Sequence, residues 1–330
     1  MRYDRLLHDR RRLIIGAGIA AAGLPLARAA DDYPSKPIKL IVPWAAGGGT
    51  DVVVRKIAPA ISERLGQNLY IDNKGGATGA IGSAIVAQSP PDGYTLLIGT
   101  ADSHSIIPHL YKKLAYDARR DFTGVSPLCF FPYALAVHPS VKARDAREFV
   151  ALAKASPGQL TFASWGVGSS AHVAAEMLSQ ASQMQVLHVP YTSTAPMMLG
   201  LVGGQVNAAI VPMPLAEQYT RGGSIRLLGL AGPKRFTGMP ELPTLAEQGY
   251  DVNAGTWVGI MGPANLPARI RDRIHEAADA VLATPSMQAD LVHMFVEPNR
   301  MSVAQYDAFL DSEYSRWGKV IDTAAIKVET

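Results

Sequence analysis

Three consecutive glycines, placed between a hydrophobic run and a helical pattern, are the residues of this sequence best suited to binding chemistry. Residues 39–51 read Lys-Leu-Ile-Val-Pro-Trp-Ala-Ala-Gly-Gly-Gly-Thr-Asp. The run at 40–42 predicts a buried strand that ends at Pro43, and Val53, Ile57 and Ile61 predict a helix over 52–65. A helix start exposes unpaired N–H groups and the positive end of the helix dipole, so it favours an anion without any Lys or Arg. The predicted ligand-binding residues of this loop are Trp44, Ala45, Ala46, Gly48, Gly49, Thr50 and Asp51.

Both nucleotide-binding glycine motifs are excluded here. A P-loop requires Gly-Lys-Ser/Thr, but Gly49 is followed by Thr50 and Asp51 with no lysine. The dinucleotide fingerprint G-x-G-x-x-G fails at its last glycine, where Val52 stands. The remaining alternative is a tight strand-to-helix turn without a ligand, in which Asp51 only stabilises the first helical turn.

Two further loops follow the next two predicted strands. Residues 73–82 are rich in glycine, with Thr78 as the expected N-cap of a helix, and residues 99–103 add hydroxyl groups. Loops at the carboxyl ends of strands converge in open α/β sheets, which is where ligands bind in such folds. These loops add Ala77, Thr78, Gly79, Thr100 and Ser103 to the predicted site.

A loop in the middle of the chain repeats the pattern of the first one. When residues 162–172 are aligned on tryptophan, Trp165 matches Trp44 and Gly168 matches Gly47, although a similarity this short can arise by chance. The loop lacks the G-x-S-x-G of a nucleophile elbow, and His172 is too close in sequence to the serines to act as their base. We therefore assign no catalytic residue, cofactor or metal, and the eight histidines show no zinc-binding spacing. The loop contributes Ser164, Gly168, Ser169 and Ser170 as ligand-binding candidates.

Strand-like and helical segments alternate along the chain, which predicts an α/β protein. Strands are expected at 38–42, 69–73, 94–98, 160–164, 185–189, 206–211 and 225–231. Helices are expected at 52–65, 81–87, 146–155, 171–182, 195–203, 268–282, 286–293 and 303–320, with a loop and short helix at 100–114. Apolar segments at 125–137 and 256–261 read as two crossings between lobes. They predict a discontinuous first lobe, 33–130 with 256–330, and a second lobe, 131–255.

The N-terminus has the features of an export signal. Arg10, Arg11 and Arg12 precede a moderately apolar stretch and a small-x-small cleavage site ending at Ala29, which favours twin-arginine export of residues 1–29. A general secretory signal and an uncleaved anchor are the alternatives. Residues 1–29 carry a net charge of +4, so with the whole chain at +3 the remainder carries about −1. The basic balance therefore gives no support to nucleic-acid binding, and the single Cys129 is expected to be a buried hydrophobe.

Several of these motifs resemble one family, the Bug receptors. These are the extracytoplasmic solute-binding proteins of tripartite tricarboxylate transporters, the TctC type. The resemblance is carried, in order, by residues 36–51, 73–82, 91–97, 188–191, 203–206, 240–245 and 257–267. It covers nearly the whole chain after the predicted signal.

The resemblance implies a two-lobed type II periplasmic-binding-protein fold that closes on its ligand by hinge motion. It also implies a carboxylate held by backbone donors and hydroxyls of the first two glycine loops, and it adds Tyr191, Thr192 and Asn207 of the second lobe. The sequence departs from the family at Thr192 and Ser193, where Lys-Gly is usual, and at Asn207, where Asp is usual. Trp44 and Thr78 also replace the commoner Phe and Gly. These departures leave the substrate open.

The expected function is therefore a periplasmic, monomeric receptor that binds a small mono- or dicarboxylate, aliphatic or aromatic, and delivers it to a membrane permease. A ligand-presenting sensory partner of a membrane kinase would use the same binding chemistry. An enzyme is the third alternative.

Overall fold

The computed structural model describes residues 33–324 and 326, and those of them from Lys36 onward belong to one compact unit. The expected export signal, residues 1–29, lies outside the described residues. Among the helices of the described part, none is both long and apolar enough to cross a membrane.

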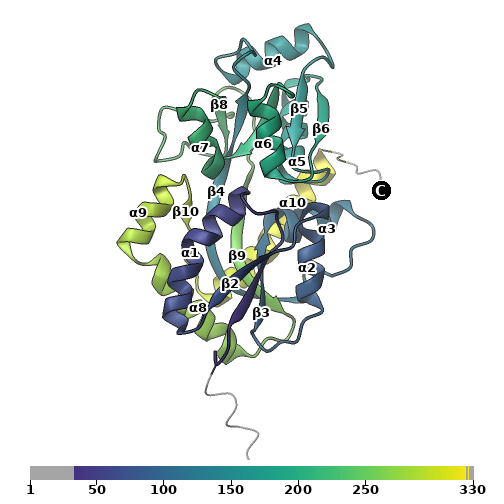
Figure 1. Ribbon diagram of the computed structural model, residues 1–330. Helices are drawn as coiled ribbons and strands as arrows, with labels where there is room; N and C mark the ends of the chain where they lie inside the picture. The colour runs from purple at the N-terminus through teal and green to yellow at the C-terminus, as the bar shows by residue number, and fades with distance from the viewer. Residues whose placement is uncertain (1–32, 325, 327–330) are drawn as a thin grey trace, which may run out of the picture. The chain divides into compact units, whose positions relative to one another are not determined.

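One mixed β-sheet organises the described chain (Figure 1). Its strand order is β2-β1-β3-β9-β4-β7-β5-β6, with β10 and β8 also paired to β4. The strands are β1 (Ile38–Val42), β2 (Leu69–Asn73), β3 (Thr95–Thr100), β4 (Phe122–Val137), β5 (Thr161–Ser164), β6 (Leu187–Pro190), β7 (Ala208–Pro212), β8 (Arg226–Ala231), β9 (Gly255–Pro263) and β10 (Glu297–Pro298).

Strand β4 belongs to both halves of this sheet. Its residues from Phe122 to Pro132 pair antiparallel with β9, whereas Tyr133 to Val137 pair with β7 and β8. We call the part built on β1, β2, β3, β9 and β10 the first lobe, and the part built on β5, β6, β7 and β8 the second lobe. The α/β class and the two-lobed architecture expected from the sequence are confirmed. The exact lobe boundaries, 33–130 with 256–330 and 131–255, stay a prediction.

Helices connect the parallel strands of each lobe. Parallel pairing joins β1 to β2 and β3, and β5 to β6 and β7, and parallel strands need a crossover connection. The helices are α1 (Gly49–Leu65), α2 (Ala80–Ala87), α3 (Ile107–Leu110), α4 (Ala146–Ala155), α5 (Ser170–Ser182), α6 (Thr194–Val202), α7 (Met213–Arg221), α8 (Ala268–Leu282), α9 (Pro285–His293) and α10 (Val303–Thr323). A 3₁₀ turn, η2 (Ala77–Gly79), and a π-helical turn, η3 (Asp102–Ile106), complete the set.

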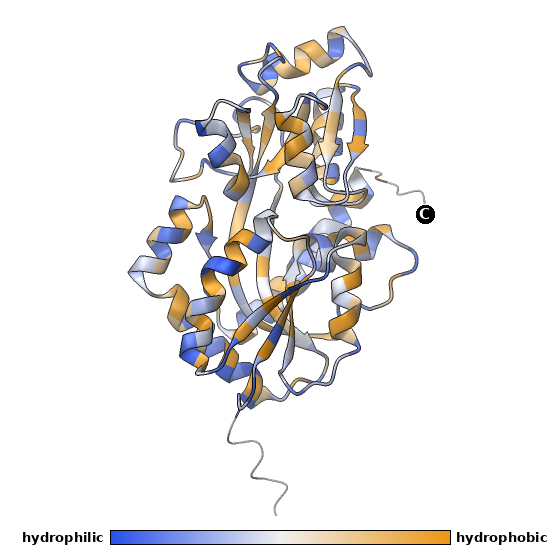
Figure 2. Cartoon of the chain, in the orientation of Figure 1, coloured by the Kyte–Doolittle hydropathy of each residue, from blue (hydrophilic) through white to orange (hydrophobic). Residues whose placement is uncertain are grey.

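Helix α1 shows how the apolar spacing positions the first glycine loop. Val53, Ile57 and Ile61 lie on one face of the helix and are fully buried against the sheet and neighbouring helices. Burial of each such side chain contributes about 1.5–3 kcal/mol. Figure 2 shows the same separation, with hydrophobic residues along the strands and hydrophilic ones on the outer turns of helices such as α1. The start of α1 is therefore held in place by its own hydrophobic face.

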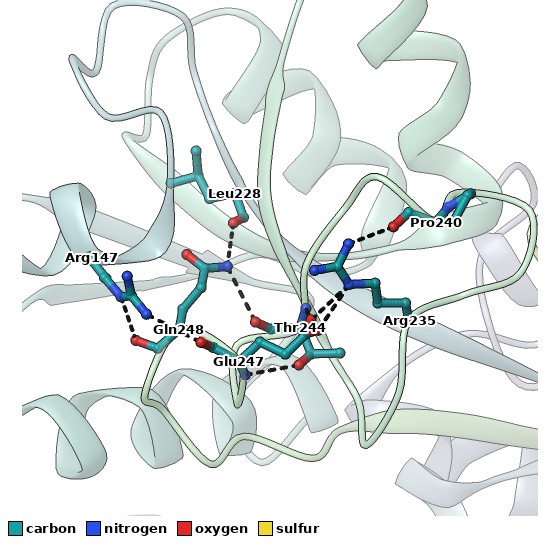
Figure 3. A network of polar contacts seen from close by, with 7 residues as sticks. All are labelled: Arg147, Leu228, Arg235, Pro240, Thr244, Glu247 and Gln248. Atoms are coloured by element: carbon teal, nitrogen blue, oxygen red, sulfur yellow. Dashed lines mark hydrogen bonds and ion pairs between the residues drawn. The ribbon is translucent and has the colours of Figure 1, made fainter.

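The segment that returns from β8 to β9 is fastened to the second lobe by polar contacts (Figure 3). Gln248 donates through Nε2 to the carbonyl oxygens of Leu228 (2.8 Å) and Thr244 (3.3 Å). Its Oε1 accepts from the amide of Ala146 (2.7 Å), and Arg147 donates to the Gln248 carbonyl (3.0 Å). These bonds hold the chain against the second lobe as far as Gln248, a few residues before β9 begins.

A few elements differ from the sequence prediction. Helix α7 was not predicted, because it is short and follows its strand without a break. The strand β10 was not predicted either, because it is only Glu297–Pro298. Helix α1 begins at Gly49, three residues earlier than expected. The expectation that Thr78 is the N-cap of α2 is wrong: the N-cap is Gly79, and Thr78 has a left-handed backbone (φ 53°) within η2. Cys129 is buried, as expected.

Candidate functional site

The first glycine loop, between β1 and α1, is braced by an internal carboxylate. Asp51 accepts hydrogen bonds from the Gly47 amide (2.9 Å), Arg55 Nε (2.8 Å) and Asn73 Nδ2 (2.8 Å). Burial raises the pKa of Asp51, but the hydrogen bonds from Arg55, Asn73 and Gly47 outweigh it, so its pKa is lowered overall. Asp51 was predicted to bind ligand, but here both of its oxygens hold the loop in shape.

The helix start that this loop presents has no side-chain cap. The N-cap of α1 is Gly48, which has no side chain to bond the first amides. The amides of Gly49 and Thr50 are the first of the helix and have no carbonyl one turn earlier within it. These donors are available to an anion.

The second glycine loop reaches the other lobe. The Thr78 hydroxyl donates to the carbonyl oxygen of Val167 (3.2 Å), and the Tyr111 hydroxyl donates to the same oxygen (3.0 Å). A methyl group on Gly166 would lie 3.1 Å from Thr78 Oγ1. The left-handed backbone of Thr78 and Gly79 (φ 90°) turns this loop toward Val167. The two lobes are thus in contact at this point.

Asp102, in the π-helical turn after β3, makes the most buried contact between the lobes. Its Oδ1 accepts from the Ser170 amide (2.7 Å) and from Trp165 Nε1 (3.3 Å), and both of its oxygens accept from the Ser170 hydroxyl (3.1 and 3.0 Å). Tyr133 Oη lies 2.8 Å from the same hydroxyl. Burial raises the pKa of Asp102, although the donors of Ser170 and Trp165 oppose that shift.

The second-lobe loop at 164–172 is stabilised by its own polar groups. Ser169 caps α5 by accepting from the His172 amide (3.3 Å), and the Gly168 amide donates to His172 Nδ1 (3.1 Å). Ser164 Oγ lies 2.7 Å from Nε2 of His188, whose ring stacks on His172 with centroids 4.1 Å apart. Burial lowers the pKa of both histidines, to about 4 for His188, where the neighbouring His172 adds to the shift.

This arrangement supplies neither a catalytic triad nor a metal site. The serines Ser164 and Ser169 bond to backbone groups or to the His188 ring, and no described carboxylate is hydrogen-bonded to that ring. Within the described residues, no group of three His, Cys, Asp or Glu side chains could hold a metal ion. The loop instead holds Trp165 and the start of α5 in fixed positions.

A small cavity lies where the loops of both lobes meet. Its volume is about 20 Å³, room for about one water molecule. Trp44 is buried in its wall, and the indole Nε1 of Trp44 has no hydrogen-bond partner among the described residues. The cavity is lined by Trp44, Gly48, Gly49, Thr50, Asp102, Phe131, Tyr133, Trp165, Thr194, Pro212 and Thr256.

The predicted site residues divide into three groups. Trp44, Gly48, Gly49 and Thr50 line the cavity directly. Gly79, Ser103 and Thr100 lie next to it: a methyl group on Gly79 would be 3.4 Å from the Trp44 ring and 3.1 Å from Ser103 Cβ, and Thr100 Oγ1 is 3.3 Å from Ser103 Oγ. Ser170 does not line the cavity itself, but it donates a hydrogen bond to Asp102, which does.

The third group does not line the cavity, and it includes the loop residues described above, Asp51, Thr78, Ser164, Gly168 and Ser169. Ala46 and Ala77 are exposed and Ala45 is half-buried. Tyr191 packs its ring against Gly200 of α6, and Thr192 is exposed. Asn207 accepts from the amide and hydroxyl of Thr161 (both 2.9 Å), at the end of β5 away from Ser164.

Seven lining residues were absent from the predicted site. Asp102 and Trp165 lay inside loops that had been recognised, and the match of Trp165 to Trp44 could have identified it. Phe131, Tyr133 and Thr256 belong to the predicted crossings, which must border any cleft between lobes. Thr194 is the first residue of α6, and Pro212 is the last residue of β7, directly before α7. Only their positions at the ends of these elements identify them.

The comparisons with known proteins agree with this geometry. The model of the tripartite tricarboxylate transporter family receptor, TctC, matches residues 53–326. The structure of Rpa4515 from R. palustris with adipate is 31% identical, covers 90% of this chain and 99% of that chain, and has a TM-score of 0.87. The periplasmic binding protein BugD is 29% identical over 90% of this chain and 100% of its own, with a TM-score of 0.85.

MatC from Rhodopseudomonas palustris, solved with bound malate, is 28% identical, covers 88% of this chain and 100% of that chain, and has a TM-score of 0.83. The family and these neighbours are solute-binding receptors, which excludes the enzyme alternative. This chain therefore belongs to the receptor family of the tripartite tricarboxylate transporters, the family that its motifs resemble.

Proposed function

We propose that this protein is a periplasmic receptor that captures a small carboxylate between its two lobes. It acts as a monomer and delivers the ligand to the membrane permease of a tripartite transporter. The adipate and malate bound in two structural relatives support the ligand class. The family itself supports the permease as partner.

One observation carries the proposal: the uncapped start of α1 and Trp44, whose buried Nε1 has no partner among the described residues, line the same cavity. In the proposal the amides of Gly49 and Thr50, with the Trp44 indole N–H, hold one carboxylate of the ligand. A buried donor without a partner costs free energy, and a ligand oxygen would remove that cost. A small anion held in this way can reach micromolar affinity, which corresponds to about −8 kcal/mol.

Ligand binding requires the lobes to separate first. The cavity of about 20 Å³ admits one water molecule, whereas even a four-carbon acid is several times larger. The contacts from Thr78 and Asp102 to the second lobe must therefore open and re-form around the ligand. Motion about β4, which runs through both lobes, and about the start of β9, where the chain returns to the first lobe, is the hinge closure that we propose.

Titration calorimetry of the purified protein with a panel of mono- and dicarboxylates tests this function, together with native mass spectrometry for co-purified ligand. In the variant Trp44→Phe the ring remains but the N–H is lost, and we expect roughly tenfold weaker binding, about 1.4 kcal/mol. Trp317→Phe is the matched control, because the N–H of Trp317 is bonded to Glu313 on α10. Absence of binding by every carboxylate, or equal losses in the two variants, would contradict the proposal.

A further inference from the structure

Asp102 occupies the position at the start of α5 that a ligand carboxylate could otherwise take. The Ser170 amide is the first of α5, and it donates to Asp102 together with the Ser170 hydroxyl and Trp165 Nε1. All of these donors belong to the second lobe, whereas Asp102 belongs to the first. The second-lobe donors facing the cleft are thus satisfied by a carboxylate of the protein itself.

The start of α1 on the opposite side of the cavity is different. Its N-cap is glycine, no side chain bonds its first amides, and the nearest carboxylate, Asp51, is turned to Gly47, Arg55 and Asn73. The start of α1 lines the cavity through Gly49, whereas the start of α5 lies behind Asp102, which lines the cavity and accepts from the Ser170 amide. The cleft therefore has one anion position that is open and one that is filled.

The Asp102 carboxylate also faces the cavity with unused acceptor capacity. Its Oδ2 accepts only from the Ser170 hydroxyl among the described residues, and Asp102 lines the cavity wall. The ion pairs of the described residues include none to Asp102; burial raises its pKa, whereas the donors of Ser170 and Trp165 favour its ionised form. In that form Asp102 accepts hydrogen bonds only, and it disfavours a second carboxylate nearby.

We propose that Asp102 determines the ligand class of this receptor. The ligand has one carboxylate, held at the start of α1, and a far end that carries no negative charge and donates a hydrogen bond to Asp102, as an amide, hydroxyl or ammonium group does. Dicarboxylates are disfavoured. This inference rests on the proposed function, because it needs a ligand carboxylate at the start of α1.

The carboxyl group of Asp102 also replaces one that is missing elsewhere. Asn207 stands where the resemblance leads one to expect an aspartate, and its side chain is bound to Thr161 at the far end of β5. A group that pairs with a donor or a cation on the ligand is therefore supplied from the first lobe. The sequence departure at Asn207 does not by itself exclude an amine-bearing ligand.

The test compares ligands of equal size that differ in one charge. Titration calorimetry measures succinate against succinamate and adipate against its monoamide, on the wild-type protein and on Asp102→Asn and Asp102→Ser. We expect the wild-type protein to bind the better monoamide at least about tenfold more tightly than its diacid. In both variants this ratio should fall to about one or invert.

Asp279→Asn is the matched control. Asp279, on α8, pairs with Arg300 outside the cleft, so this variant should keep the wild-type ratio. Equal or tighter binding of the diacid by the wild-type protein overturns the inference even if the Asp102 variants do not fold. An unchanged ratio in folded variants overturns it as well. Absence of binding by all four ligands and by the wider panel rejects the proposed function, and this inference with it.

Discussion

The carboxylates of Asp51 and Asp102 show that one side-chain type has two different roles in this cleft. Asp51 is surrounded by donors of its own lobe and fixes the first glycine loop. Asp102 takes its donors from the opposite lobe and lines the cavity where the lobes meet. Chemical type alone did not distinguish them, because the distinction lies in which lobe supplies the donors.

We expect Asp51→Asn to destabilise the protein. The asparagine amide keeps only one acceptor oxygen, so at least one of the three present donors loses its acceptor and Arg55 loses its counter-charge, at a cost of about 1–3 kcal/mol. Chemical unfolding at pH 7 measures this difference, with Asp279→Asn, a half-exposed ion pair, expected to cost at most about 1 kcal/mol. Equal costs for the two variants would contradict the bracing role of Asp51.

The same substitution has a defined pH dependence. The pKa of Asp51 is lower in the folded protein than its ordinary value, so the stabilisation is complete above the unfolded-state pKa of about 4. It is lost as the pH falls from there through the folded-state pKa. The gap between wild-type and Asp51→Asn should therefore be constant from pH 7 to about pH 5 and shrink below about pH 4.

At the residue scale, the sequence was enough to identify the loops but not their cross-lobe partners. Trp44, Gly48, Gly49 and Thr50 were predicted because strand, glycine turn and helix start are local patterns. The bond from Asp102 to Ser170 joins residues 68 positions apart, across lobes whose fit depends on all of their packing. Tyr191 and Asn207 came from the resemblance alone, and their local packing turns them elsewhere.

Among the elements, β9 is packed closely against both α10 and β4 at Gly259. A methyl group on Gly259 would lie 2.0 Å from Tyr306 Oη on α10 and 2.9 Å from the Ser126 carbonyl oxygen on β4. The helix was predicted over 303–320 and the strand only as an apolar crossing at 256–261, and their close approach was not predicted, because it depends on how α10 crosses the sheet. Glycine at this position lets α10 lie against β9.

We expect Gly259→Ala to lower the free energy of unfolding by about 1–3 kcal/mol, since the added methyl group must displace a buried ring. Chemical denaturation measures the loss. Adding Tyr306→Phe to Gly259→Ala should recover part of it, because the nearest atom is removed and Tyr306 Oη has no partner among the described residues. A variant as stable as the wild-type protein would show that α10 is not packed this closely.

On the scale of the whole molecule, the fit between the lobes depends on small residues. A methyl group on Gly49 would meet Cβ of Pro212, across the cleft, at 3.2 Å, which is tighter than ordinary contact. That group would hinder only the closed arrangement, because Gly49 has an ordinary helical position in α1. The chain's division into two lobes was predictable from its two apolar crossings, but this point of contact was not.

We expect Gly49→Ala to weaken ligand binding roughly fivefold, about 1 kcal/mol, without reducing the free energy of unfolding. Alanine is at least as favourable as glycine in a helix, so stability should stay equal or rise slightly. Calorimetry and urea unfolding separate the two effects. Gly222→Ala is the control, since its methyl group meets nothing closer than 3.7 Å, and a comparable loss of affinity there would refute the closure explanation.

The position of β9 in the sheet also has a consequence for the order in which the lobes can form during synthesis. β9 lies between β3 and β4, yet it is made more than a hundred residues after both of them begin. Strands β5 to β8 of the second lobe are all present by Ala231, so that lobe can assemble while the first still has two unpaired strand edges. Such edges are templates for wrong pairing. The edges of β3 and β4 therefore stay open to wrong pairing from the synthesis of β4 until that of Pro263, and the arrival of β9 ends this interval.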